Sequence, residues 1–267
     1  MKRKKTERQK LIWSIIFAVV FLIVWTQFHQ QGESNTPVNV PTTEVEAVSF
    51  TEVAQTDGSD AEVTYLAGDI PDVLAQVAPF SGESAYAVLN GNNPYFETEG
   101  LEPVSYEDYP GLDQLKRCVT VSAIIGQDLM PTEKRGEIGS VKPTGWHSLK
   151  FDFVDGHYLY NRCHLIGYQL TAENANVHNL ITGTRYLNVT GMLPFENLVA
   201  DYIRETGNHV AYRVTPVFYG DELVARGVLM EAWSIEDEGD GVCFNVFCYN
   251  NQPGVKIDYA TGDAVEE

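Results

Sequence analysis

A single long helical pattern, with strand patterns before and after it, restricts the fold of this chain more than any other feature. Between residues 188 and 206 the sequence reads NVTGMLPFENLVADYIRET, and its apolar side chains recur at helical spacing. The side chains of this stripe are Leu198, Val199, Tyr202 and Ile203. Gly207-Asn208 ends the pattern, because these residue types commonly stop a helix. The pattern predicts one helix with a buried face, which needs a second layer to pack against.

Strand patterns supply that second layer. The predicted strands span residues 86–89, 114–126, 155–167, 209–220, 222–235 and 241–250. Gly220-Asp221 is expected to form a hairpin-type turn between two of them. A short helix is also expected at 71–80, with Asp69 as its cap. Strands on both sides of one long helix predict an α+β fold, in which an antiparallel sheet packs the helix on one face.

The start of the long helix has two interpretations. If the chain is helical from Asn188 to Glu196, eight residues at about 100° each bring these two side chains to within roughly 80° of one another. They would then share a site. Pro194 fits the first turn of a helix better than its interior, so the alternative is a helix that begins near residue 193. Asn188 would then lie in the loop that leads into the helix.

The amino terminus predicts a membrane anchor. Residues 11–28 form an uncharged stretch of eighteen residues, long enough to cross a bilayer core. Basic residues crowd the first ten positions, and none recurs until Lys116, so residues 1–10 are expected in the cytoplasm and the remainder outside the cell. A cleaved signal peptide, giving a secreted protein, is the alternative, although no small-x-small cleavage site follows the apolar run. Residues 29–62 are polar and acidic and predict a flexible linker, and 63–267 a single extracellular domain.

Composition excludes several classes of protein. With 44% hydrophobic and 21% charged residues among 267, the chain can bury one sizeable core and is not disordered. Its four cysteines form no CxxC pair and are too few for a disulfide scaffold, so zinc is not expected. Cys243 and Cys248 lie five apart in a predicted strand, so they point to opposite faces and are expected to remain unpaired.

The residues that carry chemistry are concentrated between positions 160 and 196. Their order along the chain is Arg162, His164, Asn179, Asn188 and Glu196. A neutral imidazole can act as general base on water, and a guanidinium can clamp phosphate. One amide oxygen can hold a hard divalent cation that keeps most of its waters. The set therefore suits metal-assisted cleavage of a phosphodiester.

The stretches NRCH, NLITGTRYLN and PFEN, which contain these residues, resemble the DNA/RNA non-specific endonucleases of the ββα-metal (His-Me finger) group. Within that group the chain is most similar to the branch of streptodornases and competence DNA-entry nucleases. The resemblance covers roughly residues 85–262. The wider family carries DRGH where this chain has NRCH, so Asn161 and Cys163 depart from its pattern, whereas the Arg and His are kept.

The resemblance implies a ββα-metal catalytic core and a role for each matched residue. His164 would be the general base that deprotonates the attacking water. Asn188 would be the one protein ligand of a hydrated Mg²⁺, for which Mn²⁺ is a substitute. Asn179 would help to order the base and the waters of the metal, and Glu196 would reach the metal through water.

The basic residues are expected to contact the substrate. Arg162 occupies the Arg position of the motif, where it contacts phosphate or pairs with other protein groups. Arg135, Lys142 and Arg185 are candidates for binding substrate phosphates. The family implies 5′-phosphate and 3′-hydroxyl products. Because contacts to the phosphate backbone carry no direct sequence information, low base specificity is expected, with DNA as substrate, RNA as a further one, and no obligate protein partner.

The net charge of −19 is unusual for a nucleic-acid binder. Eight Lys and Arg but only six Asp and Glu occur between residues 116 and 185, so the region of the motif is locally positive. Remote acids are largely screened over a Debye length of about 8 Å at physiological salt. We therefore expect weak, salt-sensitive substrate binding, with a shallower salt dependence than basic DNA-binding proteins show.

Each candidate residue also has a purely structural interpretation. A His at a strand end often serves only as a hydrogen-bonding group, an Asn as a cap or turn former, and a Glu in the first turn of a helix as a favourable charge. Arg135 and Lys142 would in that case be solvated loop charges. Two other functions stay open: a metal-dependent phosphodiesterase that acts on another cell-surface phosphate polymer, and a non-catalytic surface protein that binds DNA or a partner.

Overall fold

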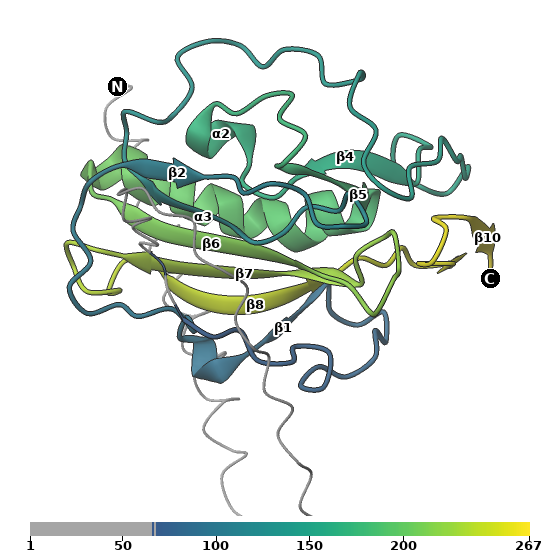
Figure 1. Cartoon of the computed structure of the whole chain (residues 1–267), viewed down its shortest axis with the longest axis horizontal. Coiled ribbons are helices and arrows are strands. Elements are labelled where there is room, and N and C mark those ends of the chain that lie inside the picture. Colours follow the sequence, from purple (N-terminus) through teal and green to yellow (C-terminus); the bar gives the residue numbers. More distant parts are fainter. Residues whose placement is uncertain (1–65, 67) are drawn as a thin grey trace, which may run out of the picture. The chain divides into compact units, whose positions relative to one another are not determined.

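A six-stranded antiparallel sheet forms the centre of the fold (Figure 1). The computed structural model describes Leu66 and residues 68–267. In spatial order, the strands of the sheet are β1 (Tyr86–Val88), β8 (Cys243–Tyr249), β7 (Gly227–Ser234), β6 (Val210–Val217), β3 (Val121–Ile125) and β2 (Tyr106–Asp108). Strands β6, β7 and β8 are buried almost throughout, because the sheet is covered on both faces.

One face of the sheet carries the long helix α3 (Leu193–Thr206) (Figure 1). Its buried side chains Val199, Ala200 and Ile203 belong to the same core cluster as Tyr212 and Val214 of β6. Gly207 ends the helix in the left-handed conformation at φ 75°, and its N–H bonds the Ile203 carbonyl at 2.9 Å. The predicted α+β fold, with an antiparallel sheet packing one helix, is confirmed.

A separate hairpin lies on the same side of the sheet as α3. It pairs β4 (Tyr160–His164) with β5 (Leu180–Thr184), and the short helix α2 (Tyr168–Thr171) follows β4 (Figure 1). A π-helical turn, η2 (Leu187–Met192), then connects β5 to α3. The chain is therefore helical through Asn188, although in a wider turn than an α-helix, so neither of the two interpretations of this segment was fully right.

Loops cover the opposite face of the sheet. Leu66 and Phe96 pack there against Ile124 of β3 and Ala211 of β6. Arg213 and Glu231 form a buried ion pair at 2.7 Å on the central strands. The remaining elements are η1 (Asn90–Asn92), a short 3₁₀ turn, and the two-stranded hairpin of β9 (Val255–Ile257) and β10 (Ala264–Glu266).

The helix expected at 71–80 is absent. Those residues form turns, and the Asp72 carboxylate, not that of Asp69, accepts a hydrogen bond from the Ala75 N–H at 3.3 Å. A segment this short gains little from helix formation. Val73 is instead buried against the face of the sheet, in a cluster with Phe247.

Two strand predictions need correction. The strand expected at 114–126 begins only at Val121, because Asp113 accepts the N–H groups of Leu115 and Arg117 in a turn. The expected turn at Gly220-Asp221 lies inside a longer connection between β6 and β7, which the Arg226 N–H closes on the Val217 carbonyl at 2.7 Å. The other predicted strands are confirmed, although β4 and β7 each begin five residues later than expected.

The two remaining predictions concern the amino-terminal segment and the cysteines. The expected basic segment, membrane span and linker, residues 1–62, lie outside the described residues. Within the described part of the chain, none of the helices combines the length and apolarity that spanning a bilayer requires. All four cysteines are free, which confirms the expectation for Cys243 and Cys248.

Candidate active site

His164 is the last residue of β4 and is only 6% exposed. Its Nε2 lies 2.7 Å from the Asn174 carbonyl oxygen, and its Nδ1 lies 3.2 Å from Nη2 of Arg135. A carbonyl can only accept and a guanidinium can only donate, so Nε2 carries the proton and Nδ1 presents its lone pair. Burial, assisted by the charge of Arg135, lowers the pKa of His164 to about 4. The imidazole is therefore neutral at physiological pH and has the lone pair that a general base needs.

Asn188 lies in η2 and is half-buried. Its Oδ1 lies 3.3 Å from the Cys163 thiol, the residue beside His164 on β4. Burial raises the pKa of Cys163 well above its usual range, so the thiol keeps its proton and can donate to Oδ1. Gly183 makes room for this side chain, because a Cβ at 183 would come within 2.6 Å of the Cys163 Cβ. Cys163, which departs from the family motif, thus contacts the candidate metal ligand Asn188 directly.

Glu196 lies in the first turn of α3 and is buried, with 9% of its surface exposed. Burial raises its pKa to about 7, although Gln169 and the charge of Arg135 favour the ionised form. The carboxylate packs closely over Gly167, where an added Cβ would meet Oε2 at 2.7 Å. Only glycine fits at 167 while Glu196 keeps this position.

Asn179 precedes β5 and is fully buried. Its Oδ1 accepts the Ile166 N–H and its Nδ2 donates to the Ile166 carbonyl, both at 2.9 Å. The Leu165 N–H also bonds the Asn179 carbonyl at 2.9 Å. The side chain therefore continues the β4–β5 pairing beyond His164 and fixes the backbone that carries the imidazole, without lining the cavity described below.

Arg162 projects from the middle of β4. Its Nε donates to the Val141 carbonyl and its Nη2 to the Gly139 carbonyl at 2.9 Å. The guanidinium also lies over the Trp146 ring, 4.1 Å from its centroid. Of the two roles expected for Arg162, the structure therefore shows pairing with other protein groups. These contacts hold the guanidinium in a fixed orientation.

One cavity of about 410 Å³, the His164 cavity, is lined by six of the eight predicted site residues. They are Arg135, Arg162, His164, Arg185, Asn188 and Glu196. Lys142 lines neighbouring hollows but not this one. Arg185 is partly neutralised by exposed Asp155 at 2.8 Å. Imidazole, carboxamide, carboxylate and guanidinium groups thus share one water-accessible space, as hydrolysis of a phosphodiester requires.

Sequence reasoning missed several groups around the cavity. Gln169 and Gly167 line it, and the Asn174 carbonyl sets the tautomer of the base. A backbone carbonyl leaves no mark in the sequence. Gly167, three residues after the motif His, was the one available signal, because a glycine within a predicted strand often marks the close approach of another group.

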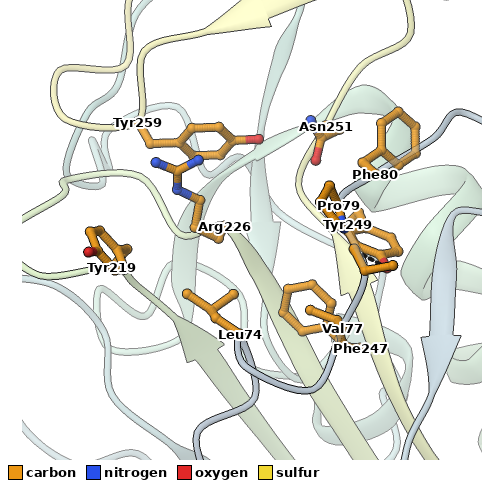
Figure 2. Close-up of a pocket in the computed structure, with 11 residues that line it drawn as sticks. Leu74, Val77, Pro79, Phe80, Tyr219, Arg226, Phe247, Tyr249, Asn251 and Tyr259 are labelled. Atoms are coloured by element: carbon orange, nitrogen blue, oxygen red, sulfur yellow. Dashed lines mark hydrogen bonds between the residues drawn. The ribbon is translucent and has the colours of Figure 1, made fainter.

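A separate hollow of about 520 Å³ contains none of the predicted site residues (Figure 2). It is lined mainly by apolar and aromatic side chains, including Leu74, Phe80 and Tyr249. Arg226, which lines it too, lies 4.1 Å from the centroid of the Tyr259 ring and is neutralised by Glu222. Among the described residues that line it there is no histidine, aspartate or glutamate.

The family model of the DNA/RNA non-specific endonucleases matches residues 100–235, which include every predicted site residue. The chain belongs to this family. It is accordingly a non-specific nuclease, a hydrolase of phosphodiester bonds in nucleic acids. The resemblance predicted from the sequence is confirmed.

Solved structures of streptococcal nucleases agree with this assignment. NucA from Streptococcus agalactiae with magnesium bound is 26% identical, with a TM-score of 0.60 over 67% of this chain and 86% of that one. The Sda1 nuclease with bound zinc is also 26% identical, with a TM-score of 0.56 over 69% of this chain and 97% of that one. Divalent metals are thus found in similar nucleases.

Proposed function

We propose that this nuclease is a Mg²⁺-dependent endonuclease of the ββα-metal type, in which β4, β5 and α3 hold the catalytic groups and His164 is the general base. The observation that carries the proposal is the neutral His164, whose Nδ1 bears a lone pair that Arg135 contacts, in the cavity that Asn188 and Glu196 also line. Through Nδ1 the imidazole takes a proton from the attacking water, while the Asn174 carbonyl holds the ring by its Nε2–H.

The donor atoms of the cavity fit a hard divalent cation. Asn188 would hold it directly through Oδ1, and Glu196 through water. The fit rests on an observation at Glu196, whose pKa burial raises to about 7, because a nearby cation would compensate for the cost of ionising a buried carboxylate. When bound, Mg²⁺ supplies charge stabilisation for the scissile phosphate and the departing oxygen. Mn²⁺ offers the same coordination chemistry and is expected to substitute for it.

The arginines position the substrate phosphates. Arg135 donates to the lone pair of the base, so we propose that it turns to the scissile phosphate when substrate binds and so frees Nδ1. Arg185, at the same cavity, is the next phosphate contact. Asn179 keeps His164 in place through the backbone. Contacts to phosphate read neither the base sequence nor the sugar 2′-hydroxyl, which supports cleavage of both DNA and RNA.

We also propose that the enzyme works outside the cell, tethered by residues 11–28. The uncharged run and the basic residues before it support this arrangement. Extracellular protease should remove the nuclease activity from intact cells, whereas activity found only in the culture medium would favour cleavage of the N-terminal segment.

A direct comparison of substrates tests the proposed function. The full-length chain should cleave plasmid DNA and RNA in Mg²⁺ or Mn²⁺ and lose this activity in chelator. A cell-surface phosphate polymer serves as the third substrate. Faster cleavage of that polymer than of DNA, or nucleic-acid cleavage that survives chelation, would count against the proposal.

A further inference from the structure

A second hollow of about 870 Å³, the side chamber, opens beside the His164 cavity. The two share the residues Arg135, Arg162, Arg185 and Asn188. A polymer whose phosphate lies at His164 must continue on both sides of the cut. The side chamber is therefore placed to receive the portion of the strand next to the scissile phosphate.

The charge of the side chamber suits a nucleic-acid strand. Lys142, Arg135 and Arg162 line it, and within the described part of the chain no carboxylate is among its lining residues. Asp155 contacts Arg185 from outside the chamber and is 77% exposed in its side chain, so it is largely screened. The chamber is thus locally cationic within a strongly acidic protein.

Flat groups also line the chamber. The Arg162 guanidinium is held by two loop carbonyls and lies over Trp146, which makes it a rigid planar surface. Tyr158 is 46% exposed and carries Lys150 over its ring at 4.6 Å. Aromatic rings and guanidinium planes are the surfaces on which unstacked bases pack in single-strand binding proteins.

Two polar groups of the chamber residues have no partner within the described structure. They are the Tyr160 hydroxyl and the Asn161 Nδ2, both buried. Tyr160 as a whole is only 3% exposed. Buried polar groups are nearly always hydrogen-bonded, so two such donors on residues that line one chamber point to a ligand that offers hydrogen-bond acceptors once these side chains turn toward it. Nucleobases offer such acceptors, in their ring nitrogens and carbonyl oxygens.

We propose that the side chamber binds one unstacked nucleobase of the strand adjacent to the scissile phosphate, and that the enzyme therefore prefers single-stranded substrate. The inference rests on the proposed function. In single strands the base is free to enter, whereas a duplex must first be unpaired and unstacked at that position, which weakens its binding. Stacking on the chamber surfaces and hydrogen bonds to Asn161 favour the inserted base.

Binding without cleavage separates this inference from the nuclease activity. Fluorescence anisotropy in chelator measures the affinity of the full-length chain for a labelled oligonucleotide, single-stranded or folded as a hairpin duplex of the same sequence. The single strand should bind about tenfold more tightly, the range that the loss of one stacked base gives. Tyr158→Ala should weaken single-strand binding about tenfold. It should raise KM by a similar factor and change kcat much less. Tyr158→Phe, which keeps the ring, should retain wild-type affinity.

Matched controls make the outcome decisive. Asn161→Ala should also weaken single-strand binding. Tyr219→Ala removes an aromatic residue that is 69% exposed and lines the separate hollow of Figure 2 but not the side chamber, so it should change nothing. Equal affinity for single strand and duplex, or wild-type affinity of both Tyr158→Ala and Asn161→Ala, would overturn the subsite and leave the nuclease intact. A wild-type chain that binds the single strand but cleaves nothing in Mg²⁺ would instead overturn the proposed function.

Discussion

The pKa values of His164 and Glu196 are shifted in opposite directions by the same cause. Burial disfavours the charged form of each, so the pKa of the imidazole falls to about 4 and that of the carboxyl rises to about 7. One group is thereby kept neutral as a base, and the other becomes responsive to a nearby cation. The cavity thus holds a neutral base beside a carboxyl that can still take up or release a proton near neutral pH.

The charge of Arg135 contributes to the low pKa of His164, which predicts the effect of removing it. In Arg135→Ala the pKa of His164 should rise, so the acid limb of kcat/KM should move to higher pH in addition to a loss of rate from the missing phosphate contact. The pH profile of oligonucleotide cleavage in saturating Mg²⁺ measures this shift. An acid limb that stays in place would show that Arg135 does not influence the base.

Glu196 should reduce the stability of the metal-free protein at alkaline pH. Its folded pKa, about 7, lies above the ordinary value of 4.5, so it contributes stability fully below pH 4.5 and loses that contribution as pH rises through 7. In chelator at pH 8, the free energy of unfolding of Glu196→Gln should therefore exceed that of the wild type by roughly 2–3 kcal/mol, as measured by denaturant unfolding. At pH 4.5 the two proteins should differ little. The same variant should cleave DNA more slowly. Equal stability of the two proteins at pH 8 would contradict the buried carboxylate.

At the scale of elements, the hydrogen bonds of the Asn179 side chain are expected to stabilise the end of β4. Asn179→Ala would leave both polar groups of the Ile166 backbone without their partners, at a cost of about 2–4 kcal/mol. Activity should fall together with stability, because the imidazole follows the backbone of β4. Urea unfolding and plasmid cleavage of the same preparation measure both. Full loss of cleavage at wild-type stability would instead assign Asn179 a direct role in the cavity.

The elements show what local patterns can and cannot predict. The long helix and the strands after it were predictable, because their periodicity extends over many residues. The helix expected at 71–80 and the strand expected from 114 failed, since a carboxylate turn at Asp72 or Asp113 outweighs a short apolar pattern. The π-helical turn at Asn188 likewise has no propensity signal.

The candidate site, too, could be predicted only in part. Its residue types and order were predictable from the motif, and six of the eight fall around one cavity. Their contacts were not predictable, because the Asn174 carbonyl and Arg135 reach His164 from loops. The contact of Asn188 with Cys163 depends in turn on the unpredicted turn of η2.

For the whole molecule, the net charge of −19 contrasts with a cationic region around the site. Four basic residues line the cavity and its side chamber: Arg135, Lys142, Arg162 and Arg185. Each neutralised phosphate contributes about −0.7 to −0.9 to the slope of log affinity against log salt. Binding should therefore weaken with a slope no steeper than about −4, which anisotropy in chelator over a series of salt concentrations measures. Affinity that does not fall with salt would show that these residues do not contact phosphate.

The central claim is that a neutral imidazole at 164 and a cation held at 188 act on the same phosphate. Plasmid cleavage by His164→Ala and Asn188→Ala, each with Mg²⁺ and with chelator, tests it most directly. We expect each variant to lose about 10²- to 10⁴-fold of the Mg²⁺-dependent rate while its fold, followed by circular dichroism, is kept. Near-normal cleavage by either folded variant would contradict the claim.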